Sequence, residues 1–437
     1  MRESDFMAPG QKSSGVVFIV CPYIVKGTHR IINPEARLEE ARGLAEAIQL
    51  NVKGTEHFKQ HIIRPATYIS KGHVEALTGP LKAFEVNVVF IDASISPVQQ
   101  RNLEKAWNCK VIDRTGLILE IFGARARTAE GRLQVELAAL TYQRSRLVRS
   151  WTHLERQRGG LGFIGGPGET QLELDRRLID ERIGRIKKEL EDVKRTRALH
   201  RKARKRVPYP IVALVGYTNA GKSTLFNRLT HANVIAEHML FATLDPTMRR
   251  VQLPSGREII LSDTVGFISD LPTLLVAAFR ATLEEVVEAD LILHVRDVSH
   301  LETDSQNQDV LQVLKNLELE DTYEDHGIEV LNKCDLLESD QVRRLKTQSL
   351  RATHPAQCVT SALDGEGVGN LLKKIDKFFA SKEKTYRFVL PLSEGKKIAW
   401  LYAHGEVLKR EDNDADAQIK VKLSFENKER FELLRGN

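Results

Sequence analysis

The sequence predicts an α/β protein with mostly parallel sheets, and three observations carry that prediction. Short apolar runs alternate with amphipathic stretches over about 100 residues near the N-terminus, the pattern of strands joined by helices. Further on, the apolar run 211–215 leads directly into a glycine-rich loop and then into a helical pattern. The chain has 437 residues, of which 42% are hydrophobic and 28% charged. That length and composition suit about three globular domains with buried cores.

The first predicted domain is a small α/β unit at residues 16–126, after a polar leader at 1–15 that we expect to be disordered. Pro34 is a typical first helical residue, with Asn33 as its cap. The predicted strands are 16–23, 86–91 and 109–113, the predicted helices are 34–50, 72–84 and 97–107, and 51–69 is extended. No glycine-rich phosphate loop interrupts these elements, so the sequence shows no chemistry for this domain.

A basic arm is predicted at residues 127–207, as two long antiparallel helices over about 128–158 and 170–206. Between residues 125 and 206 there are 22 Lys and Arg against 11 Asp and Glu, whereas the whole chain carries a net charge of +6. A solvated helix face is the plain interpretation of such a run. Its last part, residues 181–206, is strongly one-signed, with 12 Lys and Arg against 4 Asp and Glu, so we favour a nucleic-acid partner bound through its phosphates. Few aromatic residues accompany it apart from Trp151, which argues against base readout.

The loop joining the two arm helices, 159–168, holds six glycines in ten residues. It lacks the Lys and Ser or Thr of a phosphate-binding loop, so we interpret it as a docking or hinge loop.

Cysteine usage and hydropathy exclude several classes of protein. The four cysteines are far apart and form no C-x-x-C pair, which argues against a zinc site or a disulfide framework and suits a reducing cytosol. No apolar run approaches the roughly 18 residues of a membrane span. The run 16–20 is too short for a signal peptide, and Glu3 and Asp5 precede it where positive charge is expected. We therefore expect a cytoplasmic protein.

The stretch after the apolar run 211–215 matches the phosphate-binding pattern G-x-x-x-x-G-K-[ST]. It consists of Gly216, Tyr217, Thr218, Asn219, Ala220, Gly221, Lys222, Ser223 and Thr224. Its glycines let backbone N–H groups point at a polyphosphate, and the following helix adds its positive dipole end. We expect Lys222 to reach the terminal phosphates and the Ser223 hydroxyl to bind Mg²⁺.

Two further segments complete the predicted triphosphate site. The first follows the strand at 259–262 and contains Asp263, Thr264, Val265 and Gly266; the second contains Phe241, Ala242, Thr243, Leu244 and Asp245. At the sheet edge, Asp263 can hold a Mg²⁺-bound water and the Gly266 N–H can meet the γ-phosphate. Thr243 is the expected second Mg²⁺ ligand, with Thr247 as a weaker competitor. Lys222, Thr243 and Gly266 are the predicted catalytic residues.

The base is predicted from a motif at the end of another strand, Asn332, Lys333, Cys334 and Asp335, and from Ser361, Ala362 and Leu363 further on. The Asp335 carboxylate can accept hydrogen bonds from the ring N–H and exocyclic amine of guanine, which adenine lacks. Charged hydrogen bonds contribute about 1.5–3 kcal/mol each, enough to select guanine. The Lys333 stem is expected to cover the base, Asn332 to tie loops together and the Ala362 N–H to meet the guanine oxygen. These motifs predict a GTPase domain at 208–382.

The remaining elements complete the predicted GTPase domain and a small α+β domain at 383–437. Predicted strands are 247–253, 257–262, 291–297, 328–332 and 357–360, and predicted helices are 272–288, 304–317 and 367–380. In the last domain we expect a strand at 388–390, a helix at 394–404 and alternating strands through 406–434.

The motifs GYTNAGKST, FATLDPT, DTVGF, NKCD and SAL, with the linker GGLGFIGGPGETQLELDRR, resemble those of the HflX family in the Obg-HflX superfamily of translation-factor-related GTPases. The resemblance covers nearly the whole chain. It implies binding of the large ribosomal subunit and its rRNA through the basic arm and the N-terminal domain, and splitting or rescue of stalled ribosomes. It leaves open whether the N-terminal domain binds ATP.

Phe267 departs from the pattern of Ras-like GTPases, because it follows Gly266 where a water-positioning Gln would stand. A phenyl ring cannot orient water, so we expect slow intrinsic hydrolysis that a partner accelerates. Arg249, Arg250 and Arg280 are weak candidates for helpers within the chain. Phenylalanine at this position is usual in the family that the chain resembles.

Two other function classes stay open beside a ribosome-associated GTPase. One is a GTP-dependent switch that acts on a protein partner without RNA contact. The other is an RNA-modifying GTPase, although the sequence holds no catalytic Cys pair or cofactor loop to support it. We expect a monomer in either case.

Overall fold

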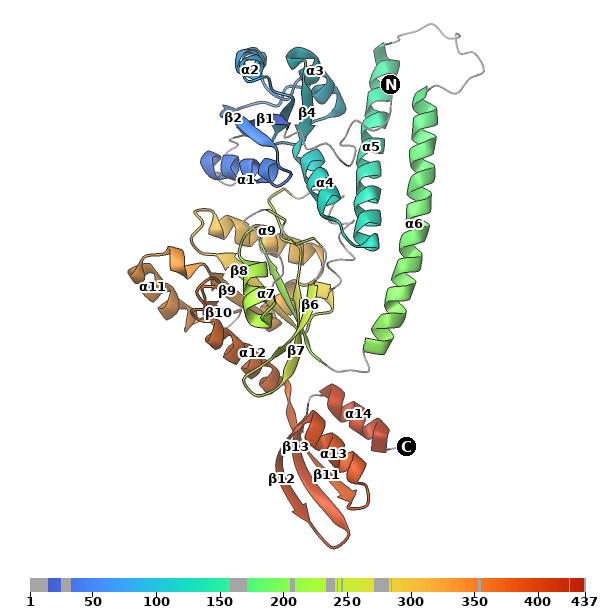
Figure 1. Cartoon of the computed structure of the whole chain (residues 1–437), viewed down its shortest axis with the longest axis vertical. Helices are drawn as coiled ribbons and strands as arrows, with labels where there is room; N and C mark the ends of the chain where they lie inside the picture. The colour runs from blue at the N-terminus through green and yellow to red at the C-terminus, as the bar shows by residue number, and fades with distance from the viewer. Residues whose placement is uncertain are drawn as a thin grey trace.

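The computed structural model describes residues 15–24, 33–157, 171–204, 209–232, 240–241, 243–244, 247–270, 283, 285–352, 355–423 and 425–435. Three separate sheets follow one another along the chain, and a pair of long helices lies beside the first two (Figure 1). The predicted α/β class and the order of its parts are confirmed. In the described part of the chain, no helix is both long and apolar enough to cross a membrane.

The N-terminal sheet has the order β2-β1-β3-β4 and is parallel throughout. Its strands are β1 (Val16–Ile24), β2 (Asn51–Gln60), β3 (Val88–Ile91) and β4 (Lys110–Asp113), and its helices are α1 (Pro34–Glu46), α2 (Lys71–Ala83), α3 (Pro97–Trp107) and α4 (Arg114–Arg125). Val17 and Ile19 of β1 share a core with α1 and α4, whereas Phe18 and Val20 share another with α2 and α3. Because helices cover both faces, the central strands β1 and β3 are apolar on both sides, whereas the edge strand β2 is mostly polar.

The basic arm consists of α5 (Ala129–Gln157) and α6 (Gln171–Arg204), which lie side by side (Figure 1). Val135 and Ala138 of α5 join the core of the N-terminal domain, so α5 is anchored to that domain. The Arg182 guanidinium of α6 donates two hydrogen bonds, of 2.7 and 2.9 Å, to the Glu136 carboxylate of α5. The predicted glycine-rich loop 159–168 lies outside the described residues.

The second sheet has the order β10-β9-β8-β5-β7-β6, and β6 alone among these six strands pairs antiparallel. The strands are β5 (Ile211–Gly216), β6 (Thr247–Gln252), β7 (Glu258–Asp263), β8 (Leu291–Asp297), β9 (Gly327–Asn332) and β10 (Ala356–Val359). The helical segments are α7 (Lys222–Thr230), α9 (Thr303–Asn316), α10 (Glu320–His326), η1 (Cys334–Leu336), α11 (Ser339–Ser349) and α12 (Val368–Lys382). The parallel strands β5, β7, β8 and β9 all end on one edge, where the predicted motifs meet.

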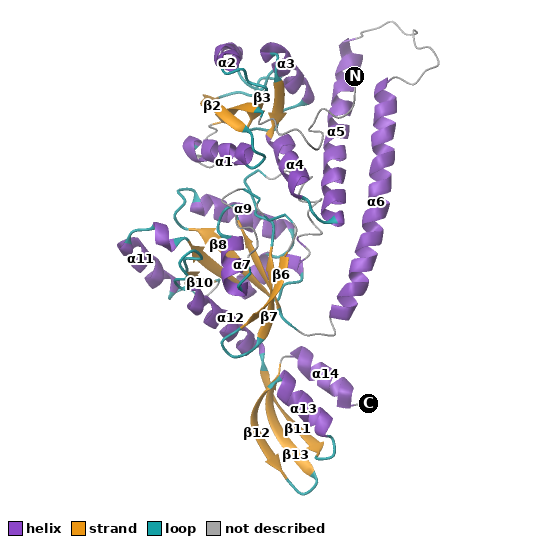
Figure 2. Cartoon of the chain, viewed as in Figure 1, coloured by secondary structure: helices purple, strands orange, loops and turns teal. Residues whose placement is uncertain are grey.

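The C-terminal domain is a three-stranded antiparallel sheet of order β11-β13-β12 with two helices on one face (Figure 2). Its elements are β11 (Lys384–Pro391), α13 (Gly395–His404), β12 (Glu406–Asp412), β13 (Asp416–Leu423) and α14 (Phe425–Arg435). The predicted strands through 434 are wrong from 425 onward. That segment is helical and buries Phe431 against Phe388 and Trp400, with ring centroids 4.6 and 5.5 Å apart.

Several helices and strands differ from the elements predicted from the sequence. Residues 51–60 are a strand, α1 ends at Glu46 instead of residue 50, and α4, α10 and α11 were not predicted. Helix α4 is packed on most of its sides, since seven of its residues are buried, so it lacks the one-sided apolar stripe that marks a surface helix. Most of the predicted helix 272–288 lies outside the described residues.

Candidate nucleotide-binding site

The phosphate-binding loop at residues 216–224, called the P-loop below, has two backbone positions where only glycine fits. Gly216 has φ +151°, and a Cβ there would lie 2.2 Å from the carbonyl oxygen of Val295. Gly221 has φ +93°, and its Cβ would lie 2.3 Å from Asn332 Nδ2. A side chain at either position would therefore push the loop away from its neighbours.

Gly266 faces the P-loop from the other side. A Cβ on it would come within 2.8 Å of the Thr218 side chain and 3.0 Å of Lys222 Nζ. This close approach brings the Gly266 backbone to the loop that is predicted to hold the phosphates, as its expected contact with the γ-phosphate requires.

Lys222 is buried, and its Nζ donates to the carbonyl oxygens of Gly216 at 3.1 Å and Tyr217 at 2.7 Å. Burial lowers the pKa of Lys222 to about 8, although the nearby Asp263 carboxylate acts in the opposite direction. A bound polyphosphate would favour the charged ammonium. The site therefore suits an anionic ligand.

The predicted metal-site residues lie together. Ser223 Oγ donates to Asp263 Oδ2 at 2.7 Å, Thr243 Oγ1 donates to the same oxygen at 3.0 Å, and the two hydroxyls are 2.8 Å apart. Burial raises the pKa of Asp263, and its Oδ1 is buried without a hydrogen-bond partner among the described residues. Two hydroxyls and a carboxylate are the hard oxygen donors that Mg²⁺ prefers, so these residues fit the ion. The competitor Thr247 is paired into β6 opposite Asp263.

The predicted base-recognition segments are tied to the P-loop by Asn332. Its Nδ2 donates to the Ala220 carbonyl at 2.9 Å, and its Oδ1 accepts from the Ala362 N–H at 2.9 Å. Asn332 thus links the two loops as expected, but it also engages the amide that was predicted to meet the guanine oxygen. Asp335 lies exposed in η1, where its carboxylate can be approached by a base.

Two residues that sequence reasoning missed support this region. Arg228 of α7 donates to the Ala362 carbonyl at 2.7 Å and also to the Leu363 carbonyl, so it holds the loop at 361–363. Asp297 pairs with Lys333 Nζ at 2.7 Å and so restrains the stem that is expected to cover the base. Neither residue stands in a recognisable motif, and only the fold brings them to the site.

Most of the remaining predicted site residues that the structure describes have buried side chains. Thr264, Val265, Cys334 and Ser361 are buried, and the Thr264 hydroxyl donates to the Leu214 carbonyl at 2.6 Å. Thr224, at the start of α7, is half-buried. Ala242 and Asp245 lie outside the described residues.

The side chains of Phe241 and Leu244 are almost fully buried and belong to the core shared with the N-terminal domain. The Phe241 ring packs edge-on against Phe122 of α4, with centroids 4.7 Å apart. Any contact of these two residues with a nucleotide would therefore have to come from their backbone.

Phe267 is a core residue, exposed by only 1%. Its N–H donates to the Gly216 carbonyl at 3.1 Å, and its carbonyl accepts from the Thr218 N–H at 2.7 Å. Its backbone thus supports the P-loop, while its ring is withdrawn from solvent and has no means of orienting a water.

The candidate helper arginines do not reach the site where the structure describes them. Arg250 of β6 pairs with Glu258 at 3.3 Å and lies over the Tyr209 ring, and Arg249 is exposed on the same strand as Arg250. Arg280 lies outside the described residues. Arg249 and Arg250 therefore do not supply the catalytic group in this structure.

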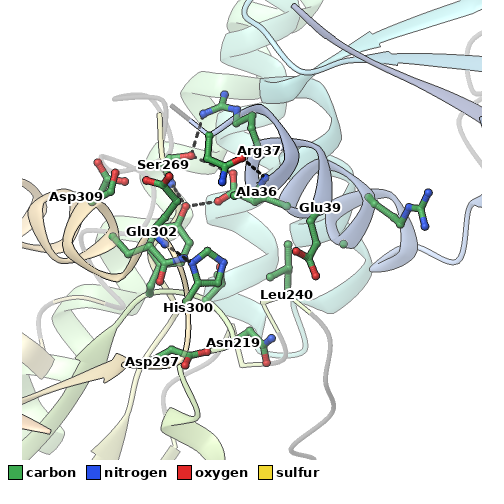
Figure 3. A pocket seen from close by; sticks show the side chains of 18 of the residues that line it. Ala36, Arg37, Glu39, Asn219, Leu240, Ser269, Asp297, His300, Glu302 and Asp309 are labelled. Atoms are coloured by element: carbon green, nitrogen blue, oxygen red, sulfur yellow. Dashed lines mark hydrogen bonds between the residues drawn. The ribbon is translucent and has the colours of Figure 1, made fainter. Parts of the chain in front are cut away.

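A cavity of about 530 Å³ opens above the P-loop, between α1 of the N-terminal domain and the second sheet (Figure 3). Asn219 and Asp297 line it from the nucleotide domain, and Arg37 and Glu39 line it from α1. Figure 3 shows side chains of both domains facing this space. The N-terminal domain therefore lines one side of the space next to the P-loop.

Four family models match successive parts of the chain. They are described as GTP-binding GTPase N-terminal (residues 35–123), GTP-binding GTPase Middle Region (125–204), 50S ribosome-binding GTPase (211–333) and HflX C-terminal domain (348–436).

Relatives that align over most of their length agree with these matches. A GTPase HflX of Magnetococcus marinus is 51% identical over 387 residues, covering 89% of this chain and 88% of the relative. A GTPase HflX of Escherichia coli is 43% identical over 362 residues, covering 82% and 83%. Among solved structures, the complex of SsGBP with GDP aligns with a TM-score of 0.49 at 23% identity, covering 83% of this chain and 98% of that one.

The exposed carboxylate in η1 gives a test of base selection. Asp335→Asn should weaken GDP binding by more than about tenfold, because charged hydrogen bonds of roughly 1.5–3 kcal/mol each are lost. The amide can donate to the extra carbonyl of xanthine, so xanthosine diphosphate should bind the variant better than GDP. Calorimetric titration of both nucleotides measures this. Asp340→Asn, an exposed site on α11, is the control. An unchanged preference in Asp335→Asn would mean that Asp335 does not face the base.

The depressed pKa of Lys222 gives a test by pH. Since this pKa is about 8 in the free protein and bound phosphates should raise it, nucleotide binding must take up protons near that pH. The bound state holds more protons, so GDP affinity should fall as the pH rises from about 7 to about 9. Calorimetry in two buffers of different protonation enthalpy measures the uptake. Lys222→Arg should bind without uptake, because its guanidinium stays charged. Absence of uptake in the unaltered protein would contradict the assignment.

Proposed function

The chain belongs to the HflX family of GTPases, and we propose that it acts in the cytoplasm on the large ribosomal subunit, where GTP controls the splitting or rescue of stalled ribosomes. The observation that carries this proposal is the combination of a nucleotide site with a basic helix pair in one chain. The match of residues 211–333 to a 50S ribosome-binding GTPase model supports the same partner.

Hydrolysis of GTP is the chemistry of the family, and the site suggests how this chain performs it. Lys222 would hold the terminal phosphates, the Gly266 N–H would donate to the γ-phosphate, and Thr243 would close over it. When bound, Mg²⁺ held by the Ser223 and Thr243 hydroxyls, and by Asp263 through a water, would neutralise phosphate charge. Phe267 is buried, so the attacking water must be oriented by another group. We propose that the ribosome completes the site and that turnover without it is slow.

The surface of α6 supports an RNA partner. Arg185, Lys187 and Lys188 are exposed on it, as are Arg176 and Arg195. Some of its charge is offset locally, since Arg176 and Arg177 lie 3.9 and 3.8 Å from acidic residues one turn on. Exposed pairs of this kind contribute little, so they leave the arm available to phosphates.

The alternative, a switch acting on a protein without RNA contact, differs in its response to salt. Each phosphate that the protein neutralises adds about −0.7 to −0.9 to the slope of log K against log salt. A protein interface carries no comparable counterion release. Binding to purified large subunits, measured by sedimentation over a range of salt, therefore separates the two functions.

The arm can be tested by charge reversal. Replacing Arg185, Lys187 and Lys188 together by Glu should weaken binding to large subunits by at least about tenfold at moderate salt and lower the salt slope, because three phosphate contacts are lost. It should also abolish the several-fold stimulation of GTP turnover that large subunits give the unaltered protein. Sedimentation and phosphate release measure the two effects.

The matched control makes the same charge change on α12, at the exposed Lys373, Lys377 and Lys382, and should leave both effects in place. Equal weakening by the two triple variants would mean that only net charge matters. A flat salt response and no stimulation by large subunits would favour the protein-partner switch.

A further inference from the structure

Four charged side chains of the N-terminal domain meet at the carboxyl edge of its sheet, facing the P-loop. Arg37 and Glu40 come from α1, Asp92 follows β3, and Arg114 opens α4. Arg114 Nη1 donates to Asp92 Oδ1 at 2.6 Å, and the pairs Arg114–Glu40 and Arg37–Asp92 are also hydrogen-bonded. The side chains of Asp92 and Arg114 are exposed by 0% and 3%, so the charges have little access to water.

This cluster continues into the nucleotide domain through Ser269. Arg114 Nη2 donates to the Ser269 carbonyl at 2.9 Å and to its Oγ at 3.0 Å, and Arg37 donates to the same Oγ at 3.1 Å. Ser269 Oγ in turn donates to Glu40 Oε1 at 3.0 Å. Arg37 also pairs with Asp270 at 2.8 Å. Ser269 is therefore held by three side chains of the other domain.

Tyr217 closes the connection from the P-loop itself. Its hydroxyl donates to the Glu40 carboxylate and accepts from the Ser269 N–H at 2.8 Å. Burial, with Glu40 beside it, raises the pKa of Tyr217 well above its ordinary value, so the hydroxyl keeps its proton and stays a donor. One hydroxyl thus touches the other domain and the segment after Gly266.

These contacts are costly to separate. Burial alone would raise the pKa of Asp92, but the guanidinium groups of Arg114 and Arg37 hold it below its ordinary value, so the carboxylate stays charged. A buried charged group that loses one partner is left poorly compensated, because water does not replace it. The cluster should therefore respond to movement of Tyr217 or Ser269 as a unit.

Both ends of the cluster lead to the phosphate site. The Tyr217 carbonyl accepts from Lys222 Nζ at 2.7 Å. Ser269 stands three residues after Gly266, whose N–H is expected to meet the γ-phosphate. Between them, Phe267 is paired to the P-loop backbone. A shift of Gly266 would therefore strain the contacts of Ser269 or move the N-terminal domain.

We propose that Glu40 and Arg114 of the N-terminal domain are positioning residues for the GTP site, acting through Tyr217 and Ser269 to hold the P-loop and the segment after Gly266 at the separation that a γ-phosphate requires. A diphosphate does not reach Gly266, so the effect is specific to the triphosphate. By linkage, the γ-phosphate stabilises the interdomain contact by the same factor that the contact strengthens triphosphate binding. The proposal rests on the nucleotide site described above and needs no ribosome.

The test compares two nucleotides on the full chain. Tyr217→Phe keeps the ring but removes the hydroxyl that joins Glu40 to Ser269, and Ser269→Ala removes the Oγ contacts. Each variant should weaken binding of a non-hydrolysable GTP analogue at least about fivefold more than it weakens binding of GDP, a ratio at the low end of measured couplings between sites. Titration calorimetry with Mg²⁺ present measures both dissociation constants. The kcat for GTP should fall in the same variants more than KM for GTP rises.

Tyr142→Phe is the matched control, since Tyr142 also donates its hydroxyl to a buried carboxylate, Asp113, but within the N-terminal domain and its arm. It should leave the ratio of the two affinities unchanged. If Tyr217→Phe and Ser269→Ala weaken the binding of GDP and of the GTP analogue equally, the contacts have a merely structural role and the proposal is overturned. Unchanged affinities for both nucleotides in both variants would also overturn it. Failure of the unaltered chain to bind both nucleotides would instead refute the nucleotide site itself.

Discussion

A single carboxylate, Glu40, accepts hydrogen bonds from Arg114, Tyr217 and Ser269 and so joins two domains at the phosphate end of the nucleotide site. Its partners are almost wholly removed from water, which makes their geometry costly to disturb. The P-loop and the segment after Gly266 are thereby fixed to α1 and α4. Phe241, two residues before Thr243, contacts the same domain through the ring of Phe122. The loops that should respond to nucleotide are therefore also domain contacts.

This arrangement suits a switch better than an efficient enzyme. The Phe267 side chain is buried in the core, and its backbone is hydrogen-bonded to the P-loop. This position therefore stabilises the loop but provides no side chain that could orient water. The basic helices extend from the N-terminal domain that the nucleotide site contacts, because α5 is packed into that domain. In the proposed function, a change at the γ-phosphate would reach the RNA-facing arm through this rigid attachment. The ribosome would in turn complete the catalytic site and accelerate GTP hydrolysis.

The sequence predicts the parts of this site that depend on local chemistry. Gly216 and Gly221 are required by backbone positions that no other residue can occupy, and Ser223, Asp263 and Asn332 occur in short motifs whose spacing reflects strand–loop–helix order. The interdomain contacts could not be predicted, because Tyr217 and Glu40 are 177 residues apart and Arg114 and Ser269 are 155 apart. Helix α4 was missed because it is buried on most sides. Segment 425–435 was misassigned because Phe431, its buried anchor, carries no signal of its own without the sheet that it covers.

The γ-phosphate should stabilise the contacts of the N-terminal domain with the nucleotide site through Glu40 and Arg114. Hydrogen exchange of the amides of α1 (Pro34–Glu46), measured in the full chain saturated with GDP or with a non-hydrolysable GTP analogue, tests it directly. We expect slower exchange in α1 with the triphosphate analogue, and a loss of this difference in Tyr217→Phe. Identical exchange in α1 with the two nucleotides would contradict it.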